Sequence, residues 1–538
     1  MSGFGERFRR AGYTVPKPLI EVDGKPIIAH VIDMFPGEAD FLFICNEDHL
    51  AEPNYRMEEI LHQYSPSGRI LGIPAHKLGP IHAVRQAEHL IDLERPVVVN
   101  YCDFTCYWDW REFKEFVANT QCTGAIPAYK GFHPHTLGST NYAYMRETKG
   151  WVEDIQEKQP YTSNRMEEYA SSGTYYFNSG KTMYDAFRLT MEQQLTVGGE
   201  YYVSLAYKPI LAAEQPVAVY PLEYFMQWGT PEDLAEYNGW SRAFRGLITD
   251  NVEGFSPRGS LVIPMAGLGQ RFANEGYKDT KPLIKVSGKS MVVQATSDLP
   301  ASTHQVFVLR SDMPGFQEVA AELKTEYPSS VIAAIPEVTE GQACTALIGL
   351  DDLERNIGDV PGPVTIGACD NGALYDAMGF QTLADNPAVD VIVWGVRGHA
   401  NAVRHPNMFG WIDADENGKI SRIAVKQPLR SPATDPIVLG TFTFKNPGDY
   451  RKAVAHLIDR DGRVNGEFYI DSCINDAIAL GMNCYVFEVD SYLSWGTPND
   501  LRTFEYWQSC FHTWDSHPYR MELDGRIDQS QRDRKNVR

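Results

Sequence analysis

The sequence predicts an α/β protein made of two tandem copies of one domain, each with a mixed, mostly parallel sheet flanked by helices. The first observation is a repeat: residues 1–28 recur as residues 265–292, with thirteen identities in an ungapped register between Gly3 and Lys25. The second is that short β-branched runs alternate with segments of helical length in both halves. The third is that 538 residues with 43% hydrophobic content are ample for two cores.

Each copy opens on a glycine loop followed by spaced cations. Glycines allow a sharp turn that brings N–H groups close to an anion, and arginine is a fixed fork for phosphate oxygens. Prolines on both sides of Lys17 stiffen its backbone, although Thr280 replaces the first proline in copy two. The pattern predicts a polyphosphate cradle, and its repetition disfavours the alternative of a turn with a solvated basic face. The assigned residues are Gly3, Gly5, Arg7, Lys17 and Lys25 in copy one, and Gly267, Gly269, Arg271, Lys281 and Lys289 in copy two.

This stretch resembles the signature of the sugar-phosphate nucleotidyltransferases (nucleoside-diphosphate-sugar pyrophosphorylases) of the capsule and surface-polysaccharide type. That signature is a Gly-x-Gly-x-Arg-Phe loop, then Pro-Lys-Pro-Leu, then a Gly-Lys-Pro turn. The resemblance covers both halves and implies two GT-A/Rossmann-like domains. The predicted organisation is a first domain over 1–249, a linker over 250–259, a second domain over 260–516, and a charged tail over 517–538 that we expect to be disordered.

The two copies differ at their start. In copy two the glycine loop follows an apolar strand, Ser260 to Pro264, whereas in copy one Met1 already lies in the loop. The strand that should lead into the first loop is therefore missing from the sequence. Either the start codon lies upstream or the first sheet is incomplete, and the sequence interpretation favours the misplaced start.

A helix over 27–35, a strand over 41–44 and a helix over 55–64 lead to a glycine that enters another helix. This glycine is Gly79 in copy one and Gly341 in copy two. Backbone amides at such a position commonly bind a base or phosphate, and a plain strand-to-helix turn is the alternative. Copy two has the family-like sequence Glu-Gly-x-Ala-Cys-Thr, whereas copy one departs from it, which leaves a different base or substrate open.

The next strand ends in an aspartate in each copy, Asp103 at the end of 97–103 and Asp370 at the end of 364–370. Ligands of open α/β sheets collect at the carboxyl ends of strands, so these residues are predicted to hold Mg²⁺. In the family resembled here this position is the metal-binding aspartate, and a capping role is the alternative. Asp109 and Asp376, six residues later, are interpreted as caps of the next helix.

The later part of each copy resembles the acceptor half of the family. The lysine after a strand, Lys158 or Lys426, is expected to contact the phosphate of the acceptor, and an exposed strand-end lysine is the alternative. The acceptor-binding residues are Lys158, Gly173 and Glu200 in copy one and Lys426, Gly440 and Glu467 in copy two. Copy two also has Asp471 where copy one has Ser204, so a second metal ligand is in doubt for copy one. The Trp-Gly-Thr-Pro turns at 228–231 and 495–498 are interpreted as structural.

Charge and composition limit the partners. The formal net charge of −21 disfavours nucleic acid, and no apolar run is long enough to cross a membrane. The N-terminus lacks the apolar core of a signal peptide. Nine cysteines without CxxC pairs indicate free thiols in a reducing cytoplasm. The expected partners are an NTP, a phosphorylated small-molecule acceptor and Mg²⁺, with homo-oligomerisation left open.

The resulting hypothesis is transfer of a nucleoside monophosphate from an NTP to a phosphorylated acceptor, with a sugar 1-phosphate favoured and pyrophosphate released. Such a reaction needs positioning and charge neutralisation more than covalent catalysis. A GT-A glycosyltransferase is the rival, since it shares the nucleotide half and a strand-end aspartate. A third hypothesis makes one copy a non-catalytic binding domain, although two competent sites are favoured. The base and the acceptor stay open.

Overall fold

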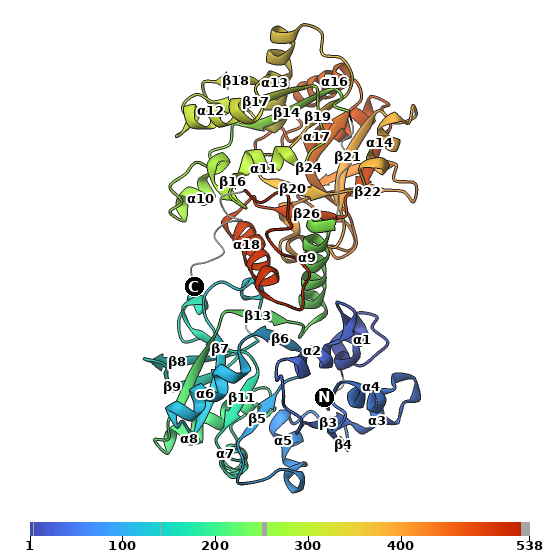
Figure 1. Cartoon of the computed structure of the whole chain (residues 1–538). Helices are drawn as coiled ribbons and strands as arrows, with labels where there is room; N and C mark the ends of the chain where they lie inside the picture. Colours follow the sequence, from blue (N-terminus) through green and yellow to red (C-terminus); the bar gives the residue numbers. More distant parts are fainter. Residues whose placement is uncertain (4, 140, 250–255, 529–538) are drawn as a thin grey trace. The chain divides into compact units, whose positions relative to one another are not determined.

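The computed structural model describes residues 1–3, 5–139, 141–249 and 256–528, which form two compact units, Met1–Asn238 and Gly239–Arg538 (Figure 1). The division falls inside helix α9 (Pro231–Thr249) and not at the predicted residue 249. The reason is that the second half of α9 belongs to the second core: the ring centroids of Trp240 and Phe244 lie 6.1 and 5.4 Å from that of Phe504.

The first unit contains short strands interleaved with helices. Its strands are β1 (Glu21–Val22), β2 (Lys25–Pro26), β3 (Leu42–Asn46), β4 (Arg69–Ile73), β5 (Val97–Asn100), β6 (Phe104–Tyr107), β7 (Gly124–Tyr129), β8 (Ala143–Thr148), β9 (Trp151–Glu157), β10 (Tyr169–Ser171), β11 (Thr174–Phe177), β12 (Val217–Leu222) and β13 (Tyr224–Gln227). Its helices are α1 (Glu6–Arg10), α2 (Ile27–Asp33), α3 (Glu47–Ala51), α4 (Met57–Tyr64), α5 (Pro80–Arg85), α6 (Trp110–Thr120), α7 (Gly180–Glu192) and α8 (Tyr207–Ala212), followed by α9.

The second unit repeats this order of elements. Its strands are β14 (Ser260–Met265), β15 (Lys285–Val286), β16 (Lys289–Ser290), β17 (His304–Arg310), β18 (Val331–Ile335), β19 (Val364–Ile366), β20 (Asn371–Leu374), β21 (Val391–Val396), β22 (Gly410–Ala414), β23 (Ile420–Val425), β24 (Ile437–Phe444), β25 (Cys484–Glu488) and β26 (Ser491–Ser494). Its helices are α10 (Gln270–Asn274), α11 (Met291–Ser297), α12 (Phe316–Glu326), α13 (Gln342–Ile357), α14 (Ala377–Asp385), α15 (Ala400–Arg404), α16 (Pro447–Asp459), α17 (Ile470–Ala479) and α18 (Pro498–Thr513).

The large sheet of the second unit has the order β18-β17-β14-β19-β24-β21-β25. The pairs from β18 to β19 are parallel, whereas β24 runs antiparallel to both of its neighbours. Helix α13 packs on β14, β17 and β18 (Figure 1). The carboxyl ends of β14 and β19 therefore deliver the glycine loop and Asp370 to one edge of the sheet.

The first unit divides the corresponding strands between two sheets. Its seven-stranded sheet has the order β10-β8-β9-β12-β7-β11-β5, and β3 and β4 pair separately. Among the described residues, no strand stands between β3 and β5 as β14 stands between β17 and β19. Residues of β5 are consequently only half-buried, whereas those of β19 are buried.

The α/β class and the mixed sheets flanked by helices are confirmed. The prediction that strands pair mostly in parallel holds for β18, β17, β14 and β19 of the second unit. In the large sheet of the first unit only β7 and β12 pair in parallel, since the parallel β3–β4 pair is separate from that sheet.

The prediction of a disordered tail is wrong for residues 517–528, while 529–538 lie outside the described residues. His517, Tyr519 and Ile527 are buried despite the charged composition of the segment. The Tyr519 hydroxyl donates to Asp524, and its ring lies 4.8 Å from that of Phe244. A few well-placed rings thus anchor a segment with a polar composition. Residues 250–255 of the predicted linker also lie outside the described part of the chain. Just after the linker, Ser260 N–H donates to the Pro363 carbonyl.

In the described part of the chain, no helix is both long and apolar enough to cross a bilayer. All nine cysteines are free thiols, six of them buried.

Candidate active site

In the first unit, two residues 86 positions apart meet at the sheet edge. Lys17 begins a single 3₁₀ turn, and its Nζ donates to Asp103 Oδ2 at 2.7 Å and to the Gly229 carbonyl at 3.2 Å. The Asp103 carbonyl in turn accepts from Trp228 N–H. The Trp-Gly-Thr-Pro turn, which occurs in both halves and which the sequence suggested was structural, therefore also contacts the lysine.

The second unit repeats this arrangement. Lys281 Nζ donates to Asp370 Oδ2 at 2.5 Å, and Trp495 N–H donates to the Asp370 carbonyl. Burial alone would lower the pKa of Lys281, but the adjacent Asp370 carboxylate outweighs burial, and the pKa is raised. The ammonium is therefore held charged at neutral pH.

The glycine loops reach these lysines. Gly5 and Gly269 have φ of +62° and +63° and immediately precede helices α1 and α10. A Cβ at Gly269 would lie 3.3 Å from Lys281 Cβ, so glycine permits the loop to approach the lysine. Space around Gly3, Gly5 and Gly267 is open, as an incoming anion would require.

A tyrosine connects the predicted acceptor residues of the first unit. Lys158 Nζ donates to the Tyr202 hydroxyl at 2.5 Å, and Tyr202 hydrogen bonds with Glu200. Burial and Glu200 raise the pKa of Tyr202, while nearby Arg7 opposes the rise. The cradle arginine and the acceptor lysine thus face the same side chain.

Tyr469 has the equivalent place in the second unit. It hydrogen bonds with Glu467 and lies near Arg271, and Lys426 Nζ stands 5.5 Å from the centre of its ring. The sequence interpretation assigned no role to Tyr202 or Tyr469. The signal was the Gly-Glu-aromatic-Tyr block shared by both copies.

Both acceptor lysines have a left-handed backbone, with φ of +60° at Lys158 and +57° at Lys426. This conformation costs about 1–2 kcal/mol for a residue with a Cβ. The shared conformation gives the lysine the same backbone geometry in both copies.

Each unit places one buried carboxyl beside that lysine, from different positions. In the first unit it is Glu157, which accepts from Ser204 Oγ at 2.6 Å. In the second unit Asp471 occupies the Ser204 position and Val425 the Glu157 position. Burial raises the pKa of both carboxyls, to about 6 for Asp471, and the neighbouring lysine opposes the rise. The first unit therefore has no aspartate at the position of Asp471, but Glu157 places a carboxyl beside the lysine instead.

Gly79 and Gly341 are required by a close backbone crossing. A Cβ at Gly79 would lie 2.6 Å from Tyr201 N, and one at Gly341 would lie 2.5 Å from the Phe468 carbonyl oxygen. Hydrogen bonds flank each glycine, such as Ile81 N–H to the Tyr201 carbonyl. The helix start is thereby fixed to the segment that carries Glu200 or Glu467. Nucleotide binding by these glycines stays a prediction.

Gly173 and Gly440 have φ of +100° and +92°. A Cβ at Gly173 would lie 3.1 Å from the rings of Tyr101 and Phe104, which flank Asp103. Gly173 therefore lies beside the loop that carries Asp103, and its role in acceptor binding stays a prediction.

The structure gives Lys25 and Lys289 other surroundings. Lys25 is ion-paired with Asp33 at the end of α2. Lys289 lines a cavity whose lining does not include Lys281 or Asp370. Neither lysine has a hydrogen bond with the Lys–Asp pairs among the described residues. Their role in nucleotide binding stays a prediction.

The oxygen donors near Asp103 suit Mg²⁺. The Gln227 side-chain oxygen is buried without a hydrogen-bond partner in the described part of the chain, and Gln227 Cγ and Nε2 approach the Cβ position of Gly229, as does Asp103 Oδ2. In the second unit Ser494 and Asp370 approach Gly496 in the same way. No cluster of three His, Cys, Asp or Glu side chains occurs among the described residues. Mg²⁺ often takes one or two protein oxygens and completes its shell with phosphates and water, so the set fits.

Asp109 and Asp376 are confirmed as helix caps. Each accepts backbone N–H groups at the start of α6 or α14. Each lies six residues after the proposed metal ligand of its unit, so this pair of aspartates can serve as a control for substitutions of the ligands.

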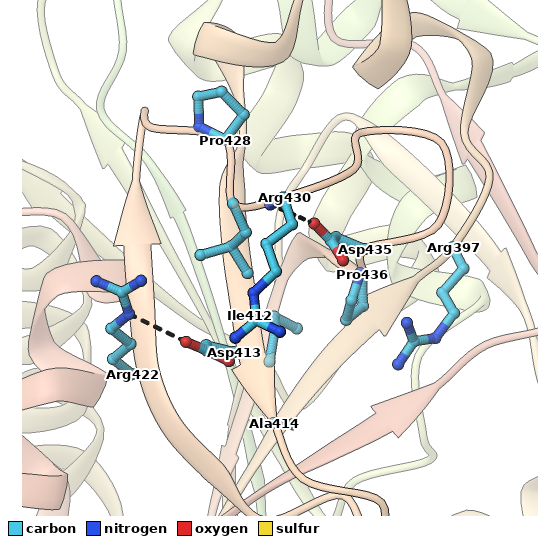
Figure 2. Close-up of a pocket in the computed structure, with 10 residues that line it drawn as sticks. Arg397, Ile412, Asp413, Ala414, Arg422, Pro428, Arg430, Asp435 and Pro436 are labelled. Atoms are coloured by element: carbon cyan, nitrogen blue, oxygen red, sulfur yellow. Dashed lines mark hydrogen bonds and ion pairs between the residues drawn. The ribbon is translucent and has the colours of Figure 1, made fainter.

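A separate pocket of about 260 Å³ lies beyond Lys426, around β22 and β23 (Figure 2). Three arginines line it, and two of them are paired: Arg422 with Asp413 and Arg397 with Glu488. Figure 2 also shows Asp435 accepting from the backbone of Arg430. None of the predicted site residues lines this pocket.

Residues 1–235 match the model of the family described as Nucleotidyl transferase. Mannose-1-phosphate guanyltransferase of Yarrowia lipolytica is 24% identical over 265 residues, covering 48% of this chain and 66% of that protein. The catalytic subunit beta of mannose-1-phosphate guanylyltransferase from Dictyostelium discoideum is 27% identical over 241 residues, covering 44% and 61%. The chain thus spans about two thirds of these relatives.

Among solved structures, a nucleoside-diphosphate-sugar pyrophosphorylase from Vibrio cholerae aligns with 45% of this chain and 98% of its own length. The identity is 22% and the TM-score 0.39. The family model spans nearly the whole first unit, up to three residues before its end at Asn238. Residues 1–235, nearly the whole first unit, are therefore similar to the nucleotidyl transferase family.

Proposed function

We propose that both units transfer a nucleoside monophosphate from an NTP to a phosphorylated acceptor and release pyrophosphate. A sugar 1-phosphate is the favoured acceptor, and the product would be an activated sugar for surface-polysaccharide precursors. The observation that carries the proposal is the lysine–aspartate pair beside a glycine loop, present in both units. The names of the relatives make GTP and mannose 1-phosphate the first pair to assay.

In this reaction an oxygen of the acceptor phosphate attacks the α-phosphorus. The new P–O bond forms as the bond from the α-phosphorus to the bridging oxygen of the β-phosphate breaks, and pyrophosphate leaves with that electron pair. Catalysis then consists of in-line positioning and neutralisation of growing negative charge.

The residues divide this work. Arg7 and the loop amides at Gly3 and Gly5 bind the β- and γ-phosphates. Lys17, held by Asp103 before substrate binds, stabilises the α-phosphate as charge develops. Lys158 binds the phosphate of the acceptor, and Tyr202 fixes its ammonium group.

The second unit uses the equivalent set, Arg271, Lys281, Lys426 and Tyr469. Asp103 with Gln227, and Asp370 with Ser494, would hold Mg²⁺, which when bound supplies positive charge against the phosphate oxygens. Glu200 and Glu467 are assigned to hydroxyl groups of the acceptor.

A GT-A glycosyltransferase is the rival function. Its substrate is a nucleoside diphosphate-sugar, which has no γ-phosphate for the glycine loop and lysine to bind. Restriction of activity to one unit is a second alternative, favoured by the absence of a described β14 counterpart in the first unit.

The test is pyrophosphate release by the full chain with four NTPs and Mg²⁺, with and without sugar 1-phosphates or phosphorylated amino alcohols. Asp103→Asn and Asp370→Asn are compared with Asp109→Asn and Asp376→Asn. The last two change acids of equal spacing at helix caps, where asparagine is also favourable. Acceptor-dependent release that the first pair of substitutions removes supports the proposal. Release of a nucleoside diphosphate from a nucleotide sugar, with no pyrophosphate, would replace it with the glycosyltransferase.

A further inference from the structure

A cavity of about 480 Å³ lies in the second unit, under the end of α11 and against α14. Its walls include Leu299, Tyr375 and Phe380, with Thr365 and Thr443 from β19 and β24. Cavities of 300–1,000 Å³ with apolar walls and a few polar groups are typical of small-molecule sites. Lys281, Asp370 and Lys426 do not line it, so it is distinct from the candidate active site.

The first unit fills the equivalent volume with aromatic side chains. Because Asp109 and Asp376 cap their helices at the same position, Trp110 corresponds to Ala377. Trp110 lies 5.0 Å from Phe35 and stacks on Phe113 at 5.6 Å between ring centres. The second unit retains Phe380 at the Phe113 position but has only a methyl group at Ala377.

Two further exchanges enlarge the cavity and make it polar. The strand pairing aligns Tyr176 with Thr443, whose hydroxyl lies 3.0 Å from that of Thr365. Met34, at the end of α2, corresponds to Asp298 at the end of α11. Asp298 is buried and ion-paired with Arg526 of the ordered tail at 3.1 Å.

The lining has an excess of positive charge. Asp298 is paired with Arg526, and Asp385 is paired with Arg258. Lys289 and Lys445 also line the cavity and form no ion pair with a carboxylate among the described residues; Lys445 donates to the Asn386 carbonyl.

The absence of one carboxylate explains why Lys289 has no ion pair in the described part of the chain. In the first unit Lys25 is paired with Asp33, but the Asp33 position is Ser297 in the second unit. In the second unit Lys289 therefore has no direct ion pair among the described residues, and its electrostatic partner is the buried carboxylate of Asp298.

We propose that this cavity binds a small molecule with a flat apolar or aromatic body and an anionic group, which Lys289 and Lys445 attract. The walls supply the apolar contacts, and the four cations of the lining outnumber its two carboxylates, Asp298 and Asp385, by two. Ala373 and Leu374 belong to strand β20, which begins at Asn371 immediately after Asp370, so one strand connects the cavity lining to the candidate active site.

The test uses the full chain and two fluorescent probes of similar aromatic body, anionic 8-anilinonaphthalene-1-sulfonate and neutral N-phenyl-1-naphthylamine. We expect saturable binding of the anion at one site per chain, at least tenfold tighter than the neutral probe. Ala377→Trp, which installs the residue of the first unit, should weaken anion binding at least tenfold. Met378→Trp, at the exposed neighbouring position, should leave it unchanged.

Lys445→Met provides a second variant that leaves the volume nearly intact. It should weaken binding of the anion about tenfold and leave the neutral probe unaffected. Far-ultraviolet circular dichroism checks the fold of each variant, and if Ala377→Trp is unfolded, Lys445→Met decides. Equal binding of the two probes, or undiminished anion binding in folded Ala377→Trp, would overturn the proposal. Nucleotidyl transfer is assayed separately, so either idea can fail alone.

Discussion

Replacing Lys17 and Lys281 together with methionine tests whether these lysines serve catalysis or stability. The side chains of Lys17 and Asp103 are 22% and 28% exposed, and the pair in the second unit is similar. The aspartate left behind can therefore be hydrated, and each unit should lose only about 1 kcal/mol. For units of this size that corresponds to about 2–4 °C in melting temperature.

Turnover should respond far more strongly. Removing one preorganised donor to a developing charge typically costs 10²–10³ in rate, or about 3–4 kcal/mol. The assay is acceptor-dependent pyrophosphate release, with thermal unfolding of the same samples. Both lysines must change together because either unit could conceal the loss in the other.

The matched control is Lys208→Met. Lys208 is ion-paired with Asp154 at 2.9 Å, and both side chains are 31% exposed. This variant should lose similar stability and keep full activity. The reasoning is refuted if the Lys17/Lys281 variant retains turnover within a few fold, or if it unfolds under conditions where the control is folded.

Three further outcomes follow from the second unit. Gly341→Ala should lower the free energy of unfolding by roughly 2–4 kcal/mol, since it adds a backbone clash to the penalty for positive φ. Gly481→Ala is the control: Gly481 lies in open space at φ +86°, and its substitution should cost only about 1 kcal/mol. Urea unfolding of the two variants gives the comparison. Because burial raises the pKa of Asp471 to about 6, stability should fall as pH rises from about 4 to 6, and Asp471→Asn should reduce that slope in urea titrations. Tyr519→Ala should lose about 3–5 kcal/mol while exposed Leu523→Ala loses almost nothing; equal melting temperatures would contradict the packed tail.

The repeat made the α/β class predictable, and with it the meeting of Lys281 with Asp370, which the repeat extends to Lys17 with Asp103. A loop after a first strand and an acid after a later strand converge wherever parallel strands share an edge. Their direct ion pair was not predictable, because it depends on side-chain reach and on the Gly229 carbonyl.

The errors have physical causes as well. Composition indicated a disordered tail, but four buried residues, His517, Tyr519, Asp524 and Ile527, suffice to anchor residues 517–528. The unit boundary was missed because one continuous helix, α9, gives no break in the sequence where its packing partners change.

Beside the acceptor lysine, the two units share a buried carboxyl but place it at different positions of the sequence. Glu157 with Ser204 in the first unit corresponds to Val425 with Asp471 in the second, and each set leaves one buried carboxyl beside a left-handed lysine. We therefore expect Glu157→Val alone to raise the KM for the acceptor about tenfold in a chain whose second unit is silenced by Asp370→Asn.

Adding Ser204→Asp should restore most of that loss, because it installs the carboxyl of the second unit. Glu157→Val with Ser204→Asn, which has nearly the same shape without the charge, is the control and should stay impaired. If both double variants recover equally, packing and not charge orients Lys158. If neither recovers, the two carboxyls are not equivalent, and the acceptor sites of the two units work differently.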